Sequence, residues 1–286
     1  MIKIYDRKTK EYEVEKVAAE GILNALYGTA PGKLGLELFV KRKLYSSLSG
    51  FFCDRGISAR KIESFIKNFN IDMTECACDI GDFKTFNDFF ARRMKPEARP
   101  FDSDRELLLS PGDGRLKAWT NVNVDKLLEV KGISYSLKEL LQDGRIAKEY
   151  DGGTYLVLRL CPTDYHRFHF IDGGICRESK RINGAYYSVN PIALDALPLA
   201  FCMNKREYAI LESDNFGDVI YIEVGATSVG SIVQTYTPGK RIERGDEKGY
   251  FKFGGSTILI LFKKGRVNVD GEILMQTEAG YETKVL

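Results

Sequence analysis

The sequence Phe253-Gly254-Gly255-Ser256-Thr257 leads directly into the apolar run Ile258-Leu259-Ile260-Leu261-Phe262. A short apolar run of this kind, preceded by glycine, predicts a buried β-strand. The two glycines permit a positive φ angle or the close approach of another group. A hydroxyl that attacks the carbonyl preceding it needs that freedom, although a tight turn before a strand is the better explanation of this pentapeptide taken alone.

The composition is that of an ordinary soluble globular protein. The chain has 286 residues, of which 44% are hydrophobic and 29% charged, enough for one large domain or two smaller ones. A net charge of +2 provides no overall field for nucleic acid. The six cysteines form no C-x-x-C pair, which suits a reducing cytoplasm. The charged start argues against a signal peptide, and no apolar run approaches the roughly 20 residues of a spanning helix, so any membrane contact is expected at the surface.

Residues 1–100 predict a mainly helical region. Residues 1–10 alternate polar and apolar, which predicts a short strand or hairpin arm, and the apolar spacing in residues 16–27 predicts a helix. The segment Lys33–Cys53 has apolar residues at helical spacing, interrupted by Lys41-Arg42-Lys43. An interfacial helix that meets anionic lipid and a core helix with a solvated face explain this pattern about equally well. The candidate membrane-contacting residues are Leu34, Leu38, Leu48, Phe51 and Phe52.

Two shorter segments complete the region. Ser58–Asn68 predicts a helix with Ser58 as its N-cap. Thr85–Met94 predicts a compact amphipathic turn of helix whose phenylalanines share one face. Pro96 and Pro100 then end the helical pattern, and we place a boundary near Pro100.

Beyond this boundary the sequence is rich in predicted strands separated by Gly-Asp, Asn-Gly and Pro-Gly turn signals. Strands and helices do not alternate regularly, so a doubly wound parallel sheet is not expected. The predicted fold class is α+β, with a helical membrane-associating region at residues 1–100 and a mostly antiparallel, β-rich catalytic body at residues 101–286. The predicted strands are Gly114–Trp119, Thr154–Leu160, Gly174–Lys180, Val219–Val224, Ser231–Thr235, Thr257–Phe262 and Arg266–Val269, and the predicted helices are Ser136–Gln142 and Ile192–Leu197.

The chain has only two histidines, His166 and His169, in the sequence Asp164-Tyr165-His166-Arg167-Phe168-His169. Histidine has a pKa suited to proton transfer near neutrality, so the pair marks a candidate site, with a structural or exposed role as the alternative. Cys161 and Asp164 add possible metal ligands, but no second cluster of cysteine or histidine matches zinc spacing. We therefore predict no metal.

Asp113 lies between two glycines in Ser110-Pro111-Gly112-Asp113-Gly114, where aspartate is a routine turn former. A carboxylate on a tight turn can also hold an imidazole in one tautomer, as a triad aspartate does. The chain thus offers an acid at Asp113, a base at His166 or His169, and a hydroxyl at Ser256. Order along the chain does not establish that they meet in space.

Several motifs in a fixed order carry a resemblance to a known family. They are F-x-x-F-F-x-R at Phe86–Arg92, S-P-x-D-G at Ser110–Gly114, D-Y-H-R-x-H at Asp164–His169, S-V-N at Ser188–Asn190, V-G-A-T-x-V-G-S at Val224–Ser231 and G-S-T at Gly255–Thr257. Through these motifs most of the chain after about Asp82 resembles the phosphatidylserine decarboxylases, pyruvoyl-dependent enzymes of the membrane surface that make phosphatidylethanolamine. Gly254 is a departure, because many members have leucine there.

The resemblance implies a proenzyme that cuts itself between Gly255 and Ser256. Ser256 would attack the Gly255 carbonyl, while His169 removes the hydroxyl proton and Asp113 orients that imidazole. The products would be a large chain of residues 1–255 and a small chain of residues 256–286 that begins with a pyruvoyl group derived from Ser256.

The resemblance also implies the reaction and its setting. The pyruvoyl carbonyl would form a Schiff base with phosphatidylserine, lose CO2 and yield phosphatidylethanolamine. His166 is the predicted proton donor, and Asn204 and Arg206 are candidates for substrate binding, since arginine suits phosphate geometry. We expect a peripheral protein on the cytoplasmic face of the cell membrane. The large and small chains of the precursor are its expected partners, and two processed molecules could form a homodimer. No nucleic-acid partner is expected.

Three other functions stay open on the sequence alone. The same fold and self-cleavage would serve a decarboxylase of soluble amino acids or of another serine phospholipid. A conventional serine hydrolase would keep Ser256 as a persisting nucleophile. A non-catalytic membrane-binding module would carry the triad-like residues incidentally.

Overall fold

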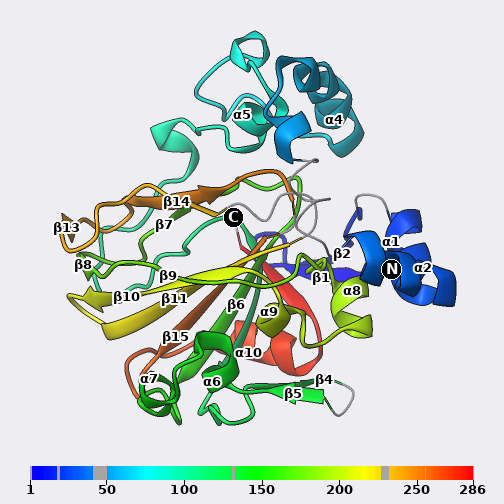
Figure 1. Cartoon of the computed structure of the whole chain (residues 1–286). Helices are drawn as coiled ribbons and strands as arrows, with labels where there is room; N and C mark the ends of the chain where they lie inside the picture. Colours follow the sequence, from blue (N-terminus) through cyan, green and yellow to red (C-terminus); the bar gives the residue numbers. More distant parts are fainter. Residues whose placement is uncertain are drawn as a thin grey trace.

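The chain folds around one large, mixed but mostly antiparallel sheet (Figure 1). The computed structural model describes residues 2–17, 20–40, 50–130, 133–226, 232–254 and 256–285. Lys41-Arg42-Lys43, Leu48, Gly255 and the end of the Val224–Ser231 motif lie outside these ranges. The predicted α+β class and antiparallel pairing are confirmed. In the described ranges no helix is long and apolar enough to cross a bilayer.

The main sheet has the strand order β13-β8-β10-β11-β15-β6-β3-β16-β1-β2, with β9 beside β10. Among these described strands, β1 and β16 pair in parallel and the other neighbours pair antiparallel. The strands are β1 (Lys3–Asp6), β2 (Glu11–Val14), β3 (Gly114–Thr120), β6 (Thr154–Leu160), β8 (Gly174–Cys176), β9 (Lys180–Ile182), β10 (Arg206–Ser213), β11 (Gly217–Gly225), β13 (Arg241–Ile242), β15 (Ser256–Phe262) and β16 (Glu282–Val285).

Two smaller sheets and several short helices flank it. The second sheet has the order β12-β14-β7 and the third pairs β4 with β5. Their strands are β4 (Leu128–Val130), β5 (Ile133–Tyr135), β7 (Arg167–His169), β12 (Ile232–Gln234) and β14 (Glu247–Phe251). The helices are α1 (Glu20–Gly28), α2 (Ala30–Gly35), η1 (Leu36–Val40), η2 (Gly56–Lys61), α4 (Ile62–Phe69), η3 (Ile80–Asp82), α5 (Phe86–Phe90), η4 (Pro96–Ala98), α6 (Leu137–Leu141), α7 (Gly144–Lys148), α8 (Pro191–Ala196), α9 (Ala200–Met203) and α10 (Gly271–Glu278).

The apolar run from the opening stretch forms β15, in the middle of the main sheet. Every residue of this strand is buried, and Ser256 lies opposite Gly225 of β11 and Leu160 of β6. Because successive side chains point to opposite faces, Leu259 and Leu261 enter one core while their neighbours enter the other. A strand buried on both faces explains why the run is continuously apolar rather than alternating.

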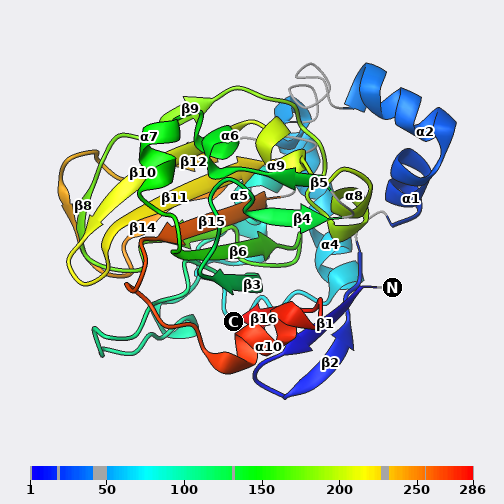
Figure 2. The same ribbon diagram turned by 90° about the horizontal axis from the view of Figure 1, so that it is seen from below.

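Each face of the main sheet is covered by different elements (Figure 2). Helices α6, α7 and α9 contribute apolar side chains to the core on one face. Strands β7, β12 and β14 and helix α10 contribute to the core on the other face. The second sheet therefore lies against the main sheet, and β7 is the strand that ends at His169.

The first hundred residues contribute to three different parts of the molecule. The predicted hairpin arm is confirmed, since β1 and β2 pair, and β1 continues into the main sheet through β16. Helix α1 packs near α8 in a small core of its own. Helices α4 and α5 form another, built largely from phenylalanines (Figure 1). The division into residues 1–100 and 101–286 stays a prediction.

The N-cap prediction for Ser58 is wrong. This serine is buried inside η2, where its hydroxyl donates to the carbonyls of Cys53 and Arg55 and accepts from the backbone N–H of Phe86. Helix α4 begins later, at Ile62. The Ser58 hydroxyl therefore joins two segments that are distant in sequence instead of starting a helix.

Two strand predictions differ from the structure, and several strands, among them β10, β14 and β16, lie outside the predicted set. Arg266–Val269 forms no strand, because its two valines pack against the core without ladder pairing. The predicted strand Gly174–Lys180 divides into β8 and the start of β9. Strand β10 was not predicted, because its first two residues, Arg206 and Glu207, are charged yet buried.

Candidate active site

The Ser256 hydroxyl is buried at the first position of β15. Neither Ser256 Oγ nor Thr257 Oγ1 has a hydrogen-bond partner among the described residues. A buried hydroxyl without a partner costs free energy and is uncommon in native structures. Gly254, two positions earlier, has φ +147°, a backbone conformation that side chains disfavour. The structure thus places a buried hydroxyl without a hydrogen-bond partner two residues after a glycine of unusual backbone conformation.

Helix α5 holds the chain just before this turn. Thr85 caps the helix by accepting from the backbone of Asp88. The side chain of Asn87 accepts from the backbone N–H of Phe253 at 2.8 Å. The Phe253 ring packs edge-on against Phe90, with 5.1 Å between centroids. The F-x-x-F-F-x-R motif therefore positions the segment that enters Ser256.

His166 lies under the same helix. Its ring centroid is 3.9 Å from that of Phe90, and the side chain is fully buried. Nδ1 lies 2.9 Å from the Asp164 carbonyl, which can only accept, so Nδ1 carries the proton. Nε2 has no partner among the described residues. Burial lowers the pKa of His166 to about 4, so near neutral pH the ring is uncharged with a free lone pair on Nε2.

The lowered pKa predicts a pH-dependent stability. Because His166 titrates near 6.5 when exposed and near 4 when folded, the unfolded chain binds a proton between these values that the folded chain does not. The contribution of His166 to the free energy of unfolding is therefore highest above pH 6.5 and decreases as the pH falls toward 4. The decrease due to His166 is about 2 kcal/mol at pH 5. The test compares the urea unfolding midpoints of Ser256→Ala and of the double variant Ser256→Ala/His166→Gln at pH 7 and pH 5. The midpoint of the chain that keeps His166 should fall more between these two pH values. Equal falls would contradict this account.

His169 is held at both ring nitrogens. Nδ1 donates to the Gly245 carbonyl at 2.9 Å, and Nε2 lies 3.3 Å from the Tyr165 hydroxyl. The Tyr165 ring stacks on the imidazole at 5.8 Å between centroids. Since a backbone carbonyl already selects the tautomer, Nε2 is the nitrogen available as a base.

The structure brings the Asp113 loop to His169 through the backbone. The N–H of His169 donates to the carbonyl of Pro111 at 2.8 Å. The Asp113 carboxylate itself accepts from Arg99, at 2.9 Å from Nε and 2.7 Å from Nη2. Burial raises the pKa of Asp113, and Arg99 opposes that shift. No hydrogen bond joins the side chains of Asp113 and His169, both of which lie in the described ranges, so the predicted orienting role stays a prediction.

A buried network of charges fixes the histidine segment to the sheet. Arg115 Nη1 contacts the Asp164 carboxylate at 2.6 Å, and Arg115 Nε contacts Glu15 at 2.9 Å. Arg159 contacts the same Glu15 and, through Nε at 3.0 Å, Glu282. Buried charges require such pairing, because an isolated one is strongly destabilising. Residues near both ends of the chain thus anchor the segment that carries the histidines.

Asn204 and Arg206 are buried and engaged by the backbone. Asn204 accepts from the N–H of Tyr187 and donates to the carbonyls of Tyr187 and Gly225. Arg206 donates to the carbonyls of Glu139, Leu140, Cys202 and Asn204. Their assignment to substrate binding stays a prediction, and the contacts they make here are internal.

Sequence reasoning missed three polar residues around the site. Arg99 belongs to no motif of the sequence, yet its guanidinium donates to the Asp113 carboxylate. Asn87 and Arg92 lie inside the F-x-x-F-F-x-R motif, where only the aromatic residues drew comment. A polar residue between phenylalanines of a buried helix was the available signal, because burying it requires a specific partner.

Comparison with known proteins identifies the family. The family model described as phosphatidylserine decarboxylase matches residues 86–281. A protein named phosphatidylserine decarboxylase proenzyme from Ruminiclostridium cellulolyticum is 63% identical over 286 residues, covering 100% of this chain and 95% of that protein. Proteins of the same name from Clostridium perfringens and Clostridium botulinum are each 57% identical, covering 100% of this chain and 97% of theirs. This chain therefore belongs to the phosphatidylserine decarboxylase family.

Proposed function

We propose that this protein is a self-processing phosphatidylserine decarboxylase, a lyase that releases CO2 from phosphatidylserine and yields phosphatidylethanolamine. Full-length similarity to proteins named as proenzymes of that activity supports the proposal. The observation that carries it is the buried Ser256 hydroxyl, which has no partner in the described structure. A serine hydroxyl without a hydrogen-bond partner at the start of a central strand is consistent with a residue that is converted to the pyruvoyl group.

Maturation follows from the chemistry of that hydroxyl. Ser256 Oγ bonds to the carbonyl carbon of Gly255 as the peptide C–N bond breaks, and the hydroxyl proton passes by way of His169 to the departing nitrogen. Loss of the Ser256 α-proton and cleavage of its Cβ–Oγ bond then release the Gly255 carboxylate. Addition of water with loss of ammonia leaves a pyruvoyl group at the new chain end. Asp113 would support His169 in the proton transfer, an arrangement favoured by their adjoining backbones.

The decarboxylation step requires a proton to be stored and returned. The pyruvoyl carbonyl supplies the electron sink for the breaking carbon–carbon bond. His166 is uncharged near neutral pH, so its Nε2 can take a proton from the substrate ammonium group. The same nitrogen then delivers that proton to the α-carbon after CO2 has left. The Asp164 carbonyl on Nδ1 stabilises the ring in the charged interval.

We expect the small chain to remain bound after scission. Strand β15 lies between β11 and β6, and β16 lies between β3 and β1. Arg159 also pairs with Glu282 across the cut. The fragments should co-elute in size-exclusion chromatography and separate only in denaturant, with uncut Ser256→Ala as the reference. A folded large chain that elutes without its partner would contradict this expectation.

The exposed apolar side chains near the amino terminus are the proposed membrane-contacting face. Leu34 of α2 and Leu38 of η1 are 61% and 50% exposed, and Phe51 and Phe52 are exposed as well. Four exposed apolar side chains in one region of sequence favour peripheral attachment at the cytoplasmic face of the cell membrane, where a diacyl substrate resides.

Charging this face should weaken membrane binding. The double variant Leu34→Glu/Leu38→Glu removes apolar contact area and adds charge, so we expect roughly tenfold or greater loss of sedimentation with phosphatidylserine vesicles. The matched control is Met275→Glu, which charges a 58% exposed apolar residue on α10. Equal binding by the double variant and wild type would refute the assignment of this face.

The activity is tested with purified wild-type protein. Phosphatidylserine in vesicles should yield CO2 and phosphatidylethanolamine, whereas free serine should yield little. Preference for free serine, or for another serine phospholipid, would establish the first of the open alternatives. Labelling of an intact, catalytically competent chain by a serine-directed phosphonate would establish a hydrolase.

A further inference from the structure

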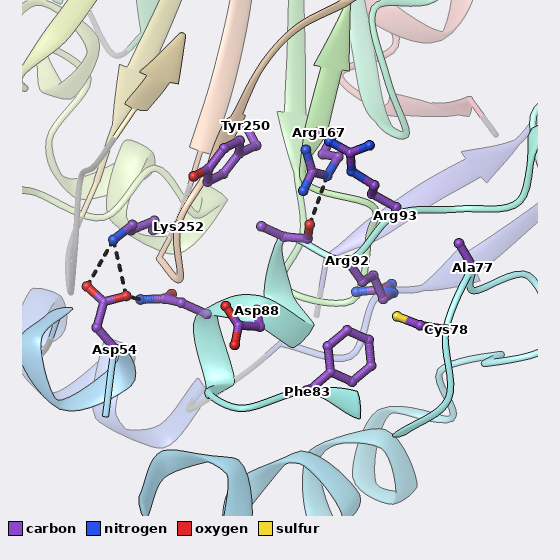
Figure 3. Close-up of a pocket in the computed structure, with 12 residues that line it drawn as sticks. Asp54, Ala77, Cys78, Phe83, Asp88, Arg92, Arg93, Arg167, Tyr250 and Lys252 are labelled. Atoms are coloured by element: carbon purple, nitrogen blue, oxygen red, sulfur yellow. Dashed lines mark hydrogen bonds and ion pairs between the residues drawn. The ribbon is translucent and has the colours of Figure 1, made fainter. Parts of the chain in front are cut away.

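A cavity of about 460 Å³ opens between α5 and the ends of β7 and β14 (Figure 3). It is lined by four basic and two acidic side chains, together with aromatic and small residues. Two of the basic residues are already paired. Arg167 contacts Glu247 at 2.8 Å, and Lys252 contacts Asp54 at 2.9 Å. The remaining two, Arg92 and Arg93, give this cavity an excess of positive charge.

Arg92 is the unusual member of this pair. The residue is 3% exposed, yet its Nε and Nη1 atoms have no hydrogen-bond partner in the described structure. Nη2 makes only long contacts, at 3.3 Å to the Thr163 carbonyl and 3.5 Å to the Asp164 carbonyl. A buried guanidinium with unmet donors is strongly destabilised unless an anion completes its hydrogen bonds. The contrast with Arg206, whose donors are all directed at carbonyls, is plain.

Arg92, which lines the cavity, connects it to the proposed catalytic histidine. The Asp164 carbonyl contacts both His166 Nδ1 and Arg92 Nη2. Phe90, whose ring lies tilted against the His166 imidazole, is the last residue of α5 and stands two residues before Arg92. In a phosphoserine headgroup only one oxygen and one methylene separate the phosphorus from the reacting α-carbon. An anion site next to His166 is therefore where such a headgroup requires one.

We propose that Arg92, with the exposed Arg93 beside it, binds the phosphodiester anion of the glycerophospholipid headgroup. This rests on the proposed function. The phosphodiester keeps its charge throughout the reaction, whereas the substrate carboxylate leaves as CO2, so a fixed cation on the phosphodiester does not oppose the chemistry. Guanidinium also matches phosphate oxygens in geometry.

Binding is tested on the uncut Ser256→Ala chain, so that the result does not depend on maturation or turnover. Calorimetric titration with soluble glycerophosphoserine should show binding, and adding Arg92→Met should weaken it by roughly ten- to a hundredfold. The matched control is Arg145→Met, an exposed arginine on α7. Should Arg92→Met fail to fold, Arg93→Met carries the test, with an expected loss of roughly threefold or more.

Parallel titrations distinguish the sources of the anion. Phosphatidylserine vesicles should compete with glycerophosphoserine, and inorganic phosphate should bind more weakly than either. The headgroup assignment would be overturned if inorganic phosphate bound as tightly as glycerophosphoserine and vesicles did not compete. It would also be overturned if the folded arginine variants bound glycerophosphoserine unchanged, or if the Ser256→Ala chain did not bind it at all. If the headgroup binds but cleaved wild type releases no CO2, the proposed function fails while this site stands.

Discussion

Ser256→Ala is expected to leave one uncut chain with no decarboxylase activity. The substitution removes the hydroxyl that takes the Gly255 acyl group, and without that ester the Ser256 residue cannot undergo the elimination that precedes the pyruvoyl group. Denaturing electrophoresis and intact mass should show a single species, whereas wild type shows residues 1–255 and a small chain beginning at former Ser256. The small chain should lack an N-terminal amine and react with hydroxylamine or borohydride.

The control is Ser64→Ala, which removes an exposed hydroxyl on α4 and should be cut and active like wild type. Cleavage of Ser256→Ala at the same bond, or an unbroken wild type with full activity, would refute self-processing at this serine. An intact and inactive wild type would favour the non-catalytic alternative.

Replacing each histidine should arrest the protein at a different stage. His169→Ala should accumulate the uncut precursor, because scission loses its base. His166→Ala should be cut normally but turn over roughly 10² to 10⁴ times more slowly, the usual contribution of one acid–base group. The two residues are three apart and serve as controls for each other. Processing is read by electrophoresis and turnover by CO2 release from vesicles.

The outcome depends on how each ring is held. His169 has Nδ1 committed to the Gly245 carbonyl and Nε2 near Tyr165, whereas His166 keeps Nε2 unpaired. An uncut His166→Ala chain with a native thermal transition would show that both histidines act in maturation. Normal cutting of His169→Ala would assign the base to another residue.

Much of the fold was accessible from sequence because local patterns reflect burial. Strand β6 matches its predicted bounds at both ends, and β15 begins one residue early, since continuous apolar runs leave few alternatives. Strand β10 was missed because two charged residues interrupt the pattern, and the partners of each include groups distant in sequence. The parallel pairing of β1 with β16 joins opposite ends of the chain, and no local spacing encodes such a contact.

The candidate site shows the same limit. The sequence alone predicts Ser256 and the histidine pair as site residues and indicates the family, because these residues sit in short motifs that follow one another in a fixed order. Folding settles which buried arginine lacks hydrogen-bond partners among the described residues, since Arg92 and Arg206 are alike as residues but differ in the carbonyls within reach. Hydrogen-bond satisfaction is a property of the folded surroundings, and a local pattern does not contain it.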